Sequence, residues 1–117
     1  MKKDPLVYID DIRDSIEAIK RYTAGVTKED FFSSTEKQDA VYRRLEVIGE
    51  AANRLSDDFR NKYSQIPWYK IVGMRNILIH EYDGIDLNLV WETIQKDIPK
   101  LEEYIKSIPY YSPDPLR

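Results

Sequence analysis

The sequence predicts an all-α protein, an up-and-down bundle of four main helices plus short helical turns. Apolar residues recur at spacings of three and four along several segments, which is the period of one helix face. Capping signals, prolines and glycines mark the ends of these segments, and no stretch shows the alternation expected of strands. With 117 residues, 42% of them hydrophobic, the chain is long enough for one domain with one core.

The first helix is predicted to begin at Asp4 and Pro5, because Asp accepts free backbone N–H groups and Pro tolerates the first helical position. Its apolar stripe comprises Leu6, Ile9, Ile12, Ile16 and Ile19. The opposite side is predicted to be a solvated face without a functional role, comprising Asp10, Asp11, Arg13, Asp14, Glu17 and Lys20. Gly25 closes this helix, and a short turn at 27–32 is expected to place two phenylalanines at one end of the core.

A long second helix is expected to start within residues 33–38, where two overlapping stretches fit the capping-box pattern. Its apolar stripe comprises Val41, Leu45, Ile48, Ala52 and Leu55. Gly49 lies inside this helix, where a glycine costs about 1 kcal/mol relative to alanine. A close approach by another helix would compensate for that cost, and the neighbour could belong to the same chain or to a twin subunit.

The polar stretch 56–66 is expected to be irregular, with one helical turn at 57–62. A third long helix should then run from Pro67 to the turn signal Asp83-Gly84. Its buried face comprises Trp68, Ile71, Val72, Leu78 and Ile79.

The last helix is predicted to be capped by Asp86. Its stripe comprises Leu87, Val90, Trp91, Ile94, Ile98, Leu101 and Ile105. Pro99 falls in its interior, so we expect a kink there. Residues 1–117 are therefore predicted to form a single helical domain, in which residues 108–117 are an extended, proline-rich C-terminal tail.

The composition excludes several classes of function. Without cysteine the chain has no disulfide, thiolate metal site or cysteine nucleophile, which fits a reducing cytoplasm. No stretch approaches the roughly 18 apolar residues of a membrane span, and the first residues lead into charged sequence, so we expect a cytoplasmic protein without membrane contact. A net charge of −3 argues against broad electrostatic capture of nucleic acid. Any contact with RNA must come from a local patch, which a second subunit could complete.

Three polar residues accompany the only histidine of the chain. Arg75 lies five residues before His80, Asn76 lies four before it, and Tyr82 lies two after it. On a helix, Asn76 and His80 share a face, and the Arg75 side chain is long enough to reach the same edge. An imidazole can act as acid or base near neutral pH, so these groups predict a chemical site. The structural alternatives are that His80 only compensates the helix dipole and that Tyr82 is an ordinary helix-terminal tyrosine.

Arg75 falls where the pattern of its helix would place another apolar residue. A cation beside an apolar stripe is costly unless it is paired, so Arg75 is expected to line a polar cleft or to face an acidic partner such as Glu46. Glu46 and Glu50, four residues apart, also suggest a carboxylate-bridged metal centre. Such centres use Glu-x-x-His motifs, and the residue three before His80 is Ile77, so we predict no metal site.

The pattern Arg75-x-x-x-x-His80-x-Tyr82 resembles the signature of the HEPN superfamily, and specifically that of the HepT-like toxins of toxin–antitoxin pairs. Two further blocks, residues 44–52 and 66–76, resemble the second and third helices of that group. The distinctive blocks lie within residues 39–91, and helices compatible with a HEPN-like bundle flank them on both sides.

The resemblance implies a ribonuclease that acts as a homodimer, with a composite active site at the interface between the subunits. Arg75 and His80 would be the catalytic pair, and Asn76 the polar residue that follows the arginine. The implied partner is an MNT-type nucleotidyltransferase antitoxin, which transfers AMP from ATP to the tyrosine matched here by Tyr82. No cofactor is implied for this chain, because the partner would use the ATP.

The chemistry of RNA cleavage without metal agrees with this implication. It needs a base for the 2′-hydroxyl group, an acid for the departing 5′-oxygen and positive charge at the phosphate. One chain offers a single histidine, so a two-fold pair would bring two imidazoles and two guanidinium groups to one cleft. The alternatives are a non-catalytic HEPN interaction module that binds a nucleotidyltransferase partner, and a plain structural bundle.

Overall fold

The structure is a computed structural model that describes residues 4–78 and 84–112, and within these residues it is helical and has no strand. The all-α prediction is therefore confirmed. The elements in chain order are α1 (Pro5–Thr23), α2 (Lys28–Phe32), α3 (Thr35–Asn53), α4 (Asp57–Lys62), α5 (Trp68–Val72), η1 (Gly73–Leu78), α6 (Leu87–Glu92), η2 (Thr93–Asp97) and α7 (Ile98–Ile105).

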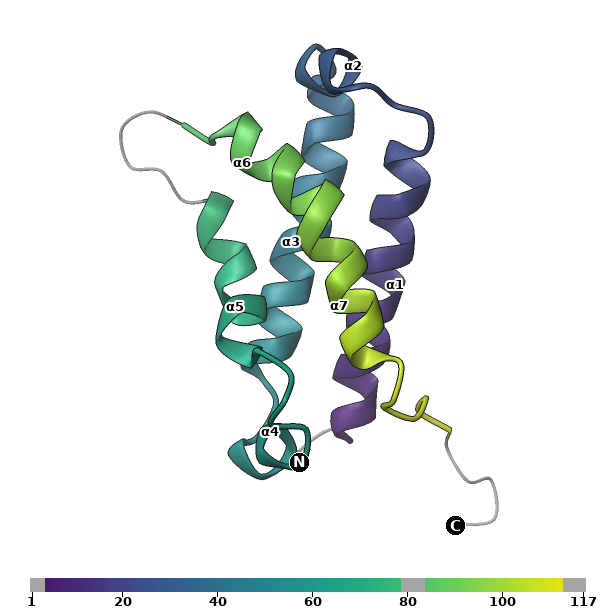
Figure 1. Cartoon of the computed structure of the whole chain (residues 1–117), viewed down its shortest axis with the longest axis vertical. Helices are drawn as coiled ribbons and strands as arrows, with labels where there is room; N and C mark the ends of the chain where they lie inside the picture. The colour runs from purple at the N-terminus through teal and green to yellow at the C-terminus, as the bar shows by residue number, and fades with distance from the viewer. Residues whose placement is uncertain (1–3, 79–83, 113–117) are drawn as a thin grey trace.

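The two longest helices, α1 and α3, run side by side and make the most extensive contact in the fold (Figure 1). The predicted stripes meet between them, and these side chains are fully or almost fully buried: Ile9, Ile12, Ile16 and Ile19 against Val41, Leu45, Ile48 and Ala52. Burying one such aliphatic side chain contributes about 1.5–3 kcal/mol, so this seam is the main source of stability. The α5–η1 segment packs on α3, and α7 packs on α1.

The helices begin where side chains can accept their free amide groups. Asp4 accepts from the amide of Leu6 at 2.9 Å, and Thr27 forms a capping box with Asp30. Helix α3 begins after Ser34, whose side chain accepts from the amide of Lys37. The two capping boxes suggested by the sequence begin at Ser33 and Thr35, so the observed cap lies one residue from each. The helical turn expected at 57–62 is confirmed as α4, which Ser56 caps, and the predicted cap Asp86 starts α6.

The third main element differs from the prediction of one long α-helix. Its α-helical part ends at Val72, and residues Gly73–Leu78 form a 3-10 helix, which has three residues per turn instead of 3.6. Hydrophobic spacing over so few residues fits either geometry, so the sequence could not separate them. The expected helix end at Asp83 lies outside the described residues, and Gly84 has a φ of 75°, as a turn there would require.

The last main element, in which a kink at Pro99 was expected, contains a π-helical segment just before that proline. Thr93–Asp97 has this wider turn, and the amide of Ile98 donates to the carbonyl of Thr93, five residues earlier. Pro99 lies in the first turn of α7, where the missing N–H is tolerated. The π segment therefore ends where the proline would otherwise have disturbed a continuous α-helix.

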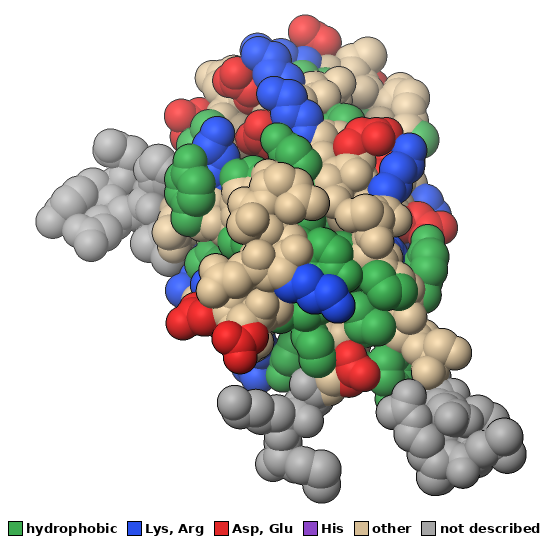
Figure 2. Space-filling view, turned by 60° about the horizontal axis from the view of Figure 1, so that its bottom comes forward, with side chains coloured by type: hydrophobic (Ala, Val, Ile, Leu, Met, Phe, Trp, Pro, Cys, Tyr) green, Lys and Arg blue, Asp and Glu red, His purple; other side chains and the backbone are tan. Residues whose placement is uncertain are grey.

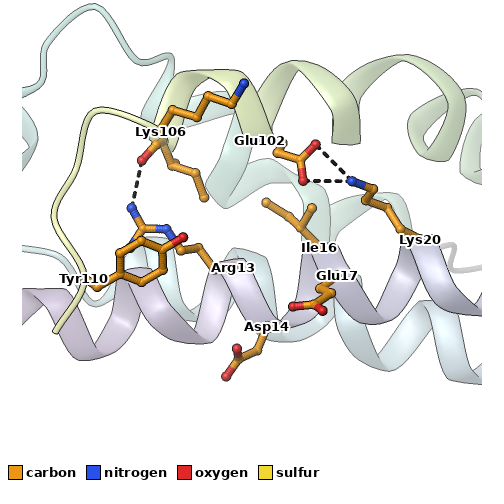
Figure 3. A pocket seen from close by; sticks show the side chains of 9 residues that line it. Arg13, Asp14, Ile16, Glu17, Lys20, Glu102, Lys106 and Tyr110 are labelled. Carbon is orange, nitrogen blue, oxygen red and sulfur yellow. Dashed lines mark hydrogen bonds and ion pairs between the residues drawn. The ribbon is translucent and has the colours of Figure 1, made fainter. Parts of the chain in front are cut away.

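Arg13 was expected on the solvated face of α1, and this expectation is wrong. Its side chain is only 14% exposed, and it donates to the carbonyl groups of Ile105 (2.9 Å) and Ile108 at the end of α7. The guanidinium also lies 4.0 Å from the ring centroid of Tyr110, and Figure 3 shows it pointing from α1 toward the chain after α7. Arg13 therefore caps α7 and holds the first described residues of the tail against α1.

Candidate active site

The backbone of Arg75 lies directly against α3 at Gly49. A Cβ atom on Gly49 would come within 2.9 Å of the Arg75 Cβ, 3.0 Å of the Arg75 amide nitrogen and 3.0 Å of the Val72 carbonyl oxygen. Only a residue without a side chain permits this approach. The close neighbour predicted from Gly49 is therefore confirmed, and it belongs to the same chain.

Arg75 forms an ion pair with Glu50, and the Nη1–Oε1 distance is 2.9 Å. Both side chains are partly exposed, at 32% for Arg75 and 47% for Glu50. The guanidinium is therefore held by a short charge-assisted hydrogen bond while part of it faces solvent. This pairing explains why a cation interrupts the apolar pattern of its segment.

Glu46 was expected as the acidic partner of Arg75, and the structure assigns that contact to Glu50 instead. Glu46 forms an ion pair with Arg43, with a nitrogen–oxygen distance of 3.5 Å. The reason is the position of Gly49 along α3, which brings η1 to the turn that carries the adjacent Glu50. Glu46 lies one turn earlier on the same helix face.

The remaining predicted site residues are only partly located. Asn76 follows Arg75 in η1 and is exposed to solvent. In a 3-10 helix, neighbouring side chains point about 120° apart, so Asn76 and Arg75 occupy different faces of η1. His80 and Tyr82 lie outside the described residues, and their roles stay predictions.

A surface groove of about 400 Å³ adjoins this ion pair between α1 and α3. Its charged lining mixes three carboxylates with two guanidinium groups, from Asp11, Glu46, Glu50, Arg43 and Arg54. Mixed charge also characterises the face drawn in Figure 2, where acidic, basic and hydrophobic side chains alternate without a continuous basic area. This groove and the face drawn in Figure 2 therefore offer individual cations and not a broad positive field.

Among residues 4–78 and 84–112 no group of three or more His, Cys, Asp or Glu side chains could hold a metal ion. None of the helices in the same ranges is long and apolar enough to cross a membrane. What the described part of the site does contain is a guanidinium group positioned by Glu50, and guanidinium groups commonly pair with carboxylates and phosphates.

The fold and the candidate site together define a small all-α bundle in which an arginine, paired with a glutamate, lies partly exposed at the surface. The chain matches the family model described as "HepT-like: Ribonuclease HepT-like" over residues 12–108. It therefore belongs to the HepT-like ribonuclease family of the HEPN superfamily, and the resemblance seen in the sequence is confirmed.

Relatives with ribonuclease names cover most of this chain. A Methanocaldococcus jannaschii protein, named as a gamma-glutamylcyclotransferase and candidate RNase, is 52% identical over 108 residues, which are 92% of this chain and 49% of that protein. The chain thus spans about half the length of that relative. The probable ribonuclease HepT of Thermococcus cleftensis is 40% identical over 102 residues, covering 87% of this chain and 93% of the relative.

A more distant relative carries a substrate in its name. The tRNA nuclease HepT of Aphanizomenon flos-aquae is 28% identical over 130 residues, and the match covers 86% of this chain and 88% of the relative. No solved structure gave a significant match.

Proposed function

We propose that this protein is the toxin component of a toxin–antitoxin system, a metal-independent endoribonuclease that acts in the cytoplasm as a homodimer. The observation that carries the proposal is the ion pair between Arg75 and Glu50, which holds a partly exposed guanidinium at the surface of the bundle. Membership of a ribonuclease family supports the choice of RNA as substrate. The tRNA nuclease name of the Aphanizomenon relative makes tRNA the first substrate to test.

The proposed reaction is an attack by the 2′-oxygen of the ribose on the adjacent phosphorus. One imidazole accepts the proton of the 2′-hydroxyl group, the 2′-oxygen forms a bond to phosphorus, and the bond from phosphorus to the 5′-oxygen breaks. A second imidazole donates a proton to the departing 5′-oxygen. Arg75 binds the non-bridging phosphate oxygens, whose negative charge increases in the transition state.

The single histidine of the chain is the reason for proposing a composite site. His80 from each of two copies would supply the base and the acid, and Arg75 from each would bind the phosphate. Asn76 is exposed next to Arg75, so its amide can orient either the imidazole or the phosphate. Glu50 positions Arg75, which is the supporting role first assigned to Glu46.

Control by a partner is part of the same proposal. An MNT-type nucleotidyltransferase antitoxin would transfer AMP from ATP to Tyr82, two residues after His80. The added group brings bulk and a negative charge close to the imidazole, and it would therefore exclude RNA phosphate from the cleft. This chain needs no cofactor of its own for that regulation.

The test is RNA cleavage in EDTA by freshly purified, unmodified protein. We expect the wild type to cut tRNA, and we expect His80→Ala and Arg75→Ala each to lower the rate at least about 100-fold. Arg54→Ala is the matched control, because Arg54 is an exposed arginine that lines the neighbouring groove, and it should retain most of the activity.

A wild-type protein that leaves RNA intact and is harmless when expressed would contradict the nuclease function. The chain would then be the non-catalytic interaction module that binds a nucleotidyltransferase. Cleavage that disappears in EDTA would contradict metal independence alone.

A further inference from the structure

A surface pocket of about 570 Å³ lies at the end of the bundle where α4 leads into α5. Figure 1 shows α4 at this end, next to the start of α5. The pocket shares no lining residue with the groove between α1 and α3. Its volume is typical of sites that bind small ligands. Its lining includes Asp57, Arg60, Asn61, Ser64, Trp68 and Tyr69.

Two side chains fix the walls of this pocket. Arg60 donates from Nη2 to the carbonyl groups of Ala52 (2.8 Å) and Asn53 (3.0 Å) at the end of α3. The indole nitrogen of Trp68, an almost completely buried residue, donates to the carbonyl groups of Arg60 (3.2 Å) and Tyr63 (3.1 Å). These bonds tie α4 to α3 and α5 to α4. The shape of the pocket therefore does not depend on a ligand.

The groups that the pocket offers are an aromatic ring and several polar side chains. Tyr69 has 77% of its surface exposed. Asp57, Asn61 and Ser64 are exposed as well, and none of their side chains makes a hydrogen bond or ion pair within the residues that the structure describes. A carboxylate accepts hydrogen bonds, whereas an amide and a hydroxyl both donate and accept. The pocket thus combines a flat apolar face with free donors and acceptors.

The charges in the pocket disfavour an anionic ligand. Of the described residues that line it, Arg60 is the only cation, and its Nη2 already donates to the two carbonyl groups of α3. Asp57 is an unpaired carboxylate, which would repel a phosphate. A nucleobase is planar and uncharged, and its edge carries donors and acceptors. Unpaired bases of RNA are commonly bound by stacking on an aromatic side chain, with hydrogen bonds to the exposed edge.

We propose that this pocket binds an unpaired base of the RNA substrate, which stacks on Tyr69. The inference rests on the proposed function, because it takes RNA to be the substrate bound at Arg75. Tyr69 and Arg75 lie on one continuous helical segment, α5 followed by η1. Along such a segment their positions are about 10 Å apart, and their side chains leave it in directions less than about a quarter turn apart. A strand with a phosphate at Arg75 therefore brings a nearby base within reach of Tyr69.

The test uses a short single-stranded oligonucleotide that contains all four bases and in which every 2′-hydroxyl group is methylated. The proposed reaction cannot cut this strand, because the attacking oxygen is blocked, so binding is measured without cleavage. Fluorescence anisotropy of a terminal label gives the dissociation constant. We expect Tyr69→Ala to raise this constant about 10-fold, and Tyr69→Phe, which keeps the aromatic face, to change it less than about twofold.

Tyr111→Ala is the matched control. It removes another exposed tyrosine, which lies in the chain after α7 and does not line the pocket, and it should bind like the wild type. Because Tyr69 is largely exposed, its replacement should leave the fold intact. Binding by Tyr69→Ala as tight as that of the wild type would overturn the proposal.

A second strand separates stacking from charge, since it keeps the phosphates and lacks the inner bases. The wild type should bind this abasic strand about 10-fold more weakly than the complete strand. Tyr69→Ala should bind the two strands with similar affinity, because the contact between base and ring is already missing. A wild type that does not distinguish the strands, or a loss that is equally large in Tyr69→Ala, would contradict base stacking on Tyr69.

These outcomes are separable from those of the nuclease test. A protein that cuts tRNA, with Tyr69→Ala at the wild-type kcat and KM, would contradict the base pocket and leave the nuclease function standing. A protein that binds the methylated strand through Tyr69 but cuts no RNA would support the pocket and contradict the nuclease function.

Discussion

Arg75 is the residue on which the proposed site depends, and Glu50 is the only ion-pair partner that the described chain gives it. Partly exposed ion pairs of this kind contribute only about 0–1 kcal/mol to stability, because solvent screens them. The 2.9 Å contact therefore matters more for the direction of the guanidinium than for the fold. Glu50 is therefore expected to position the guanidinium of Arg75 and to contribute little to the stability of the fold.

The corresponding prediction compares two glutamates on one helix face. Glu50→Ala should lower the turnover number for RNA cleavage about 10-fold or more, since Arg75 loses its orientation, while the unfolding free energy changes by less than about 1 kcal/mol. Glu46→Ala is the matched control and should leave both quantities nearly unchanged, because Glu46 pairs with Arg43 and not with Arg75. Steady-state kinetics and thermal unfolding measure the two effects. Equal losses of activity in both variants would contradict the assignment.

The sequence predicted that Arg75 needs a polar surrounding but could not decide between two carboxylates. Glu46 and Glu50 are one turn apart, so periodicity places both on the same side of α3. The deciding signal is Gly49, which marks the turn where η1 approaches, and Glu50 is its immediate neighbour. The sequence near Arg13 contains no comparable signal for its burial. The carbonyl groups to which Arg13 donates belong to residues more than 90 positions later in the chain.

At the scale of elements, α3 and the α5–η1 segment approach each other so closely at Gly49 that a side chain at this position would meet backbone atoms. In Gly49→Ala, the new Cβ would press on the Arg75 amide and the Val72 carbonyl, which cannot turn aside as a flexible side chain can. Overpacking costs about 1–3 kcal/mol, which exceeds the gain of about 1 kcal/mol from replacing glycine in a helix. We therefore expect a net loss of stability in denaturant unfolding, together with reduced RNA cleavage.

Gly73→Ala is the control for this variant. A Cβ at Gly73 meets nothing within 4 Å, and the residue has a φ of −66°, which alanine adopts readily. Its stability should stay the same or rise slightly. If Gly49→Ala proved as stable as Gly73→Ala, the close approach would not constrain the position of Arg75.

The positions of the helices could be predicted because capping residues and apolar stripes act locally. Asp4 and Asp86 each cap the helix that they were expected to begin. The short turns expected at 27–32 and 57–62 are helices capped by Thr27 and Ser56. The 3-10 and π segments could not be predicted, since their periods of three and about four residues differ little from 3.6 over five or six positions. Each arises where packing or a proline changes the geometry of a turn.

At the scale of the whole molecule, the mixed charges on its surface bear on how an activity against RNA could be controlled. The chain has a net charge of −3, and acidic side chains lie close to the arginine site at Glu46 and Glu50. In the proposed function, binding of phosphate would depend on a few cations, so one additional negative group near them should have a large effect. Modification of Tyr82 by AMP would add such a group.

The last prediction concerns this modification. Incubation with a nucleotidyltransferase partner and ATP should raise the intact mass by AMP units and abolish RNA cleavage, because the modification would add bulk and negative charge two residues along the chain from His80. Tyr82→Phe should gain no AMP and should stay active in the presence of the partner. Tyr69→Phe, which removes the hydroxyl of a highly exposed tyrosine elsewhere, is the control and should be modified like the wild type. A mass gain that persists in Tyr82→Phe would show that another residue is the acceptor.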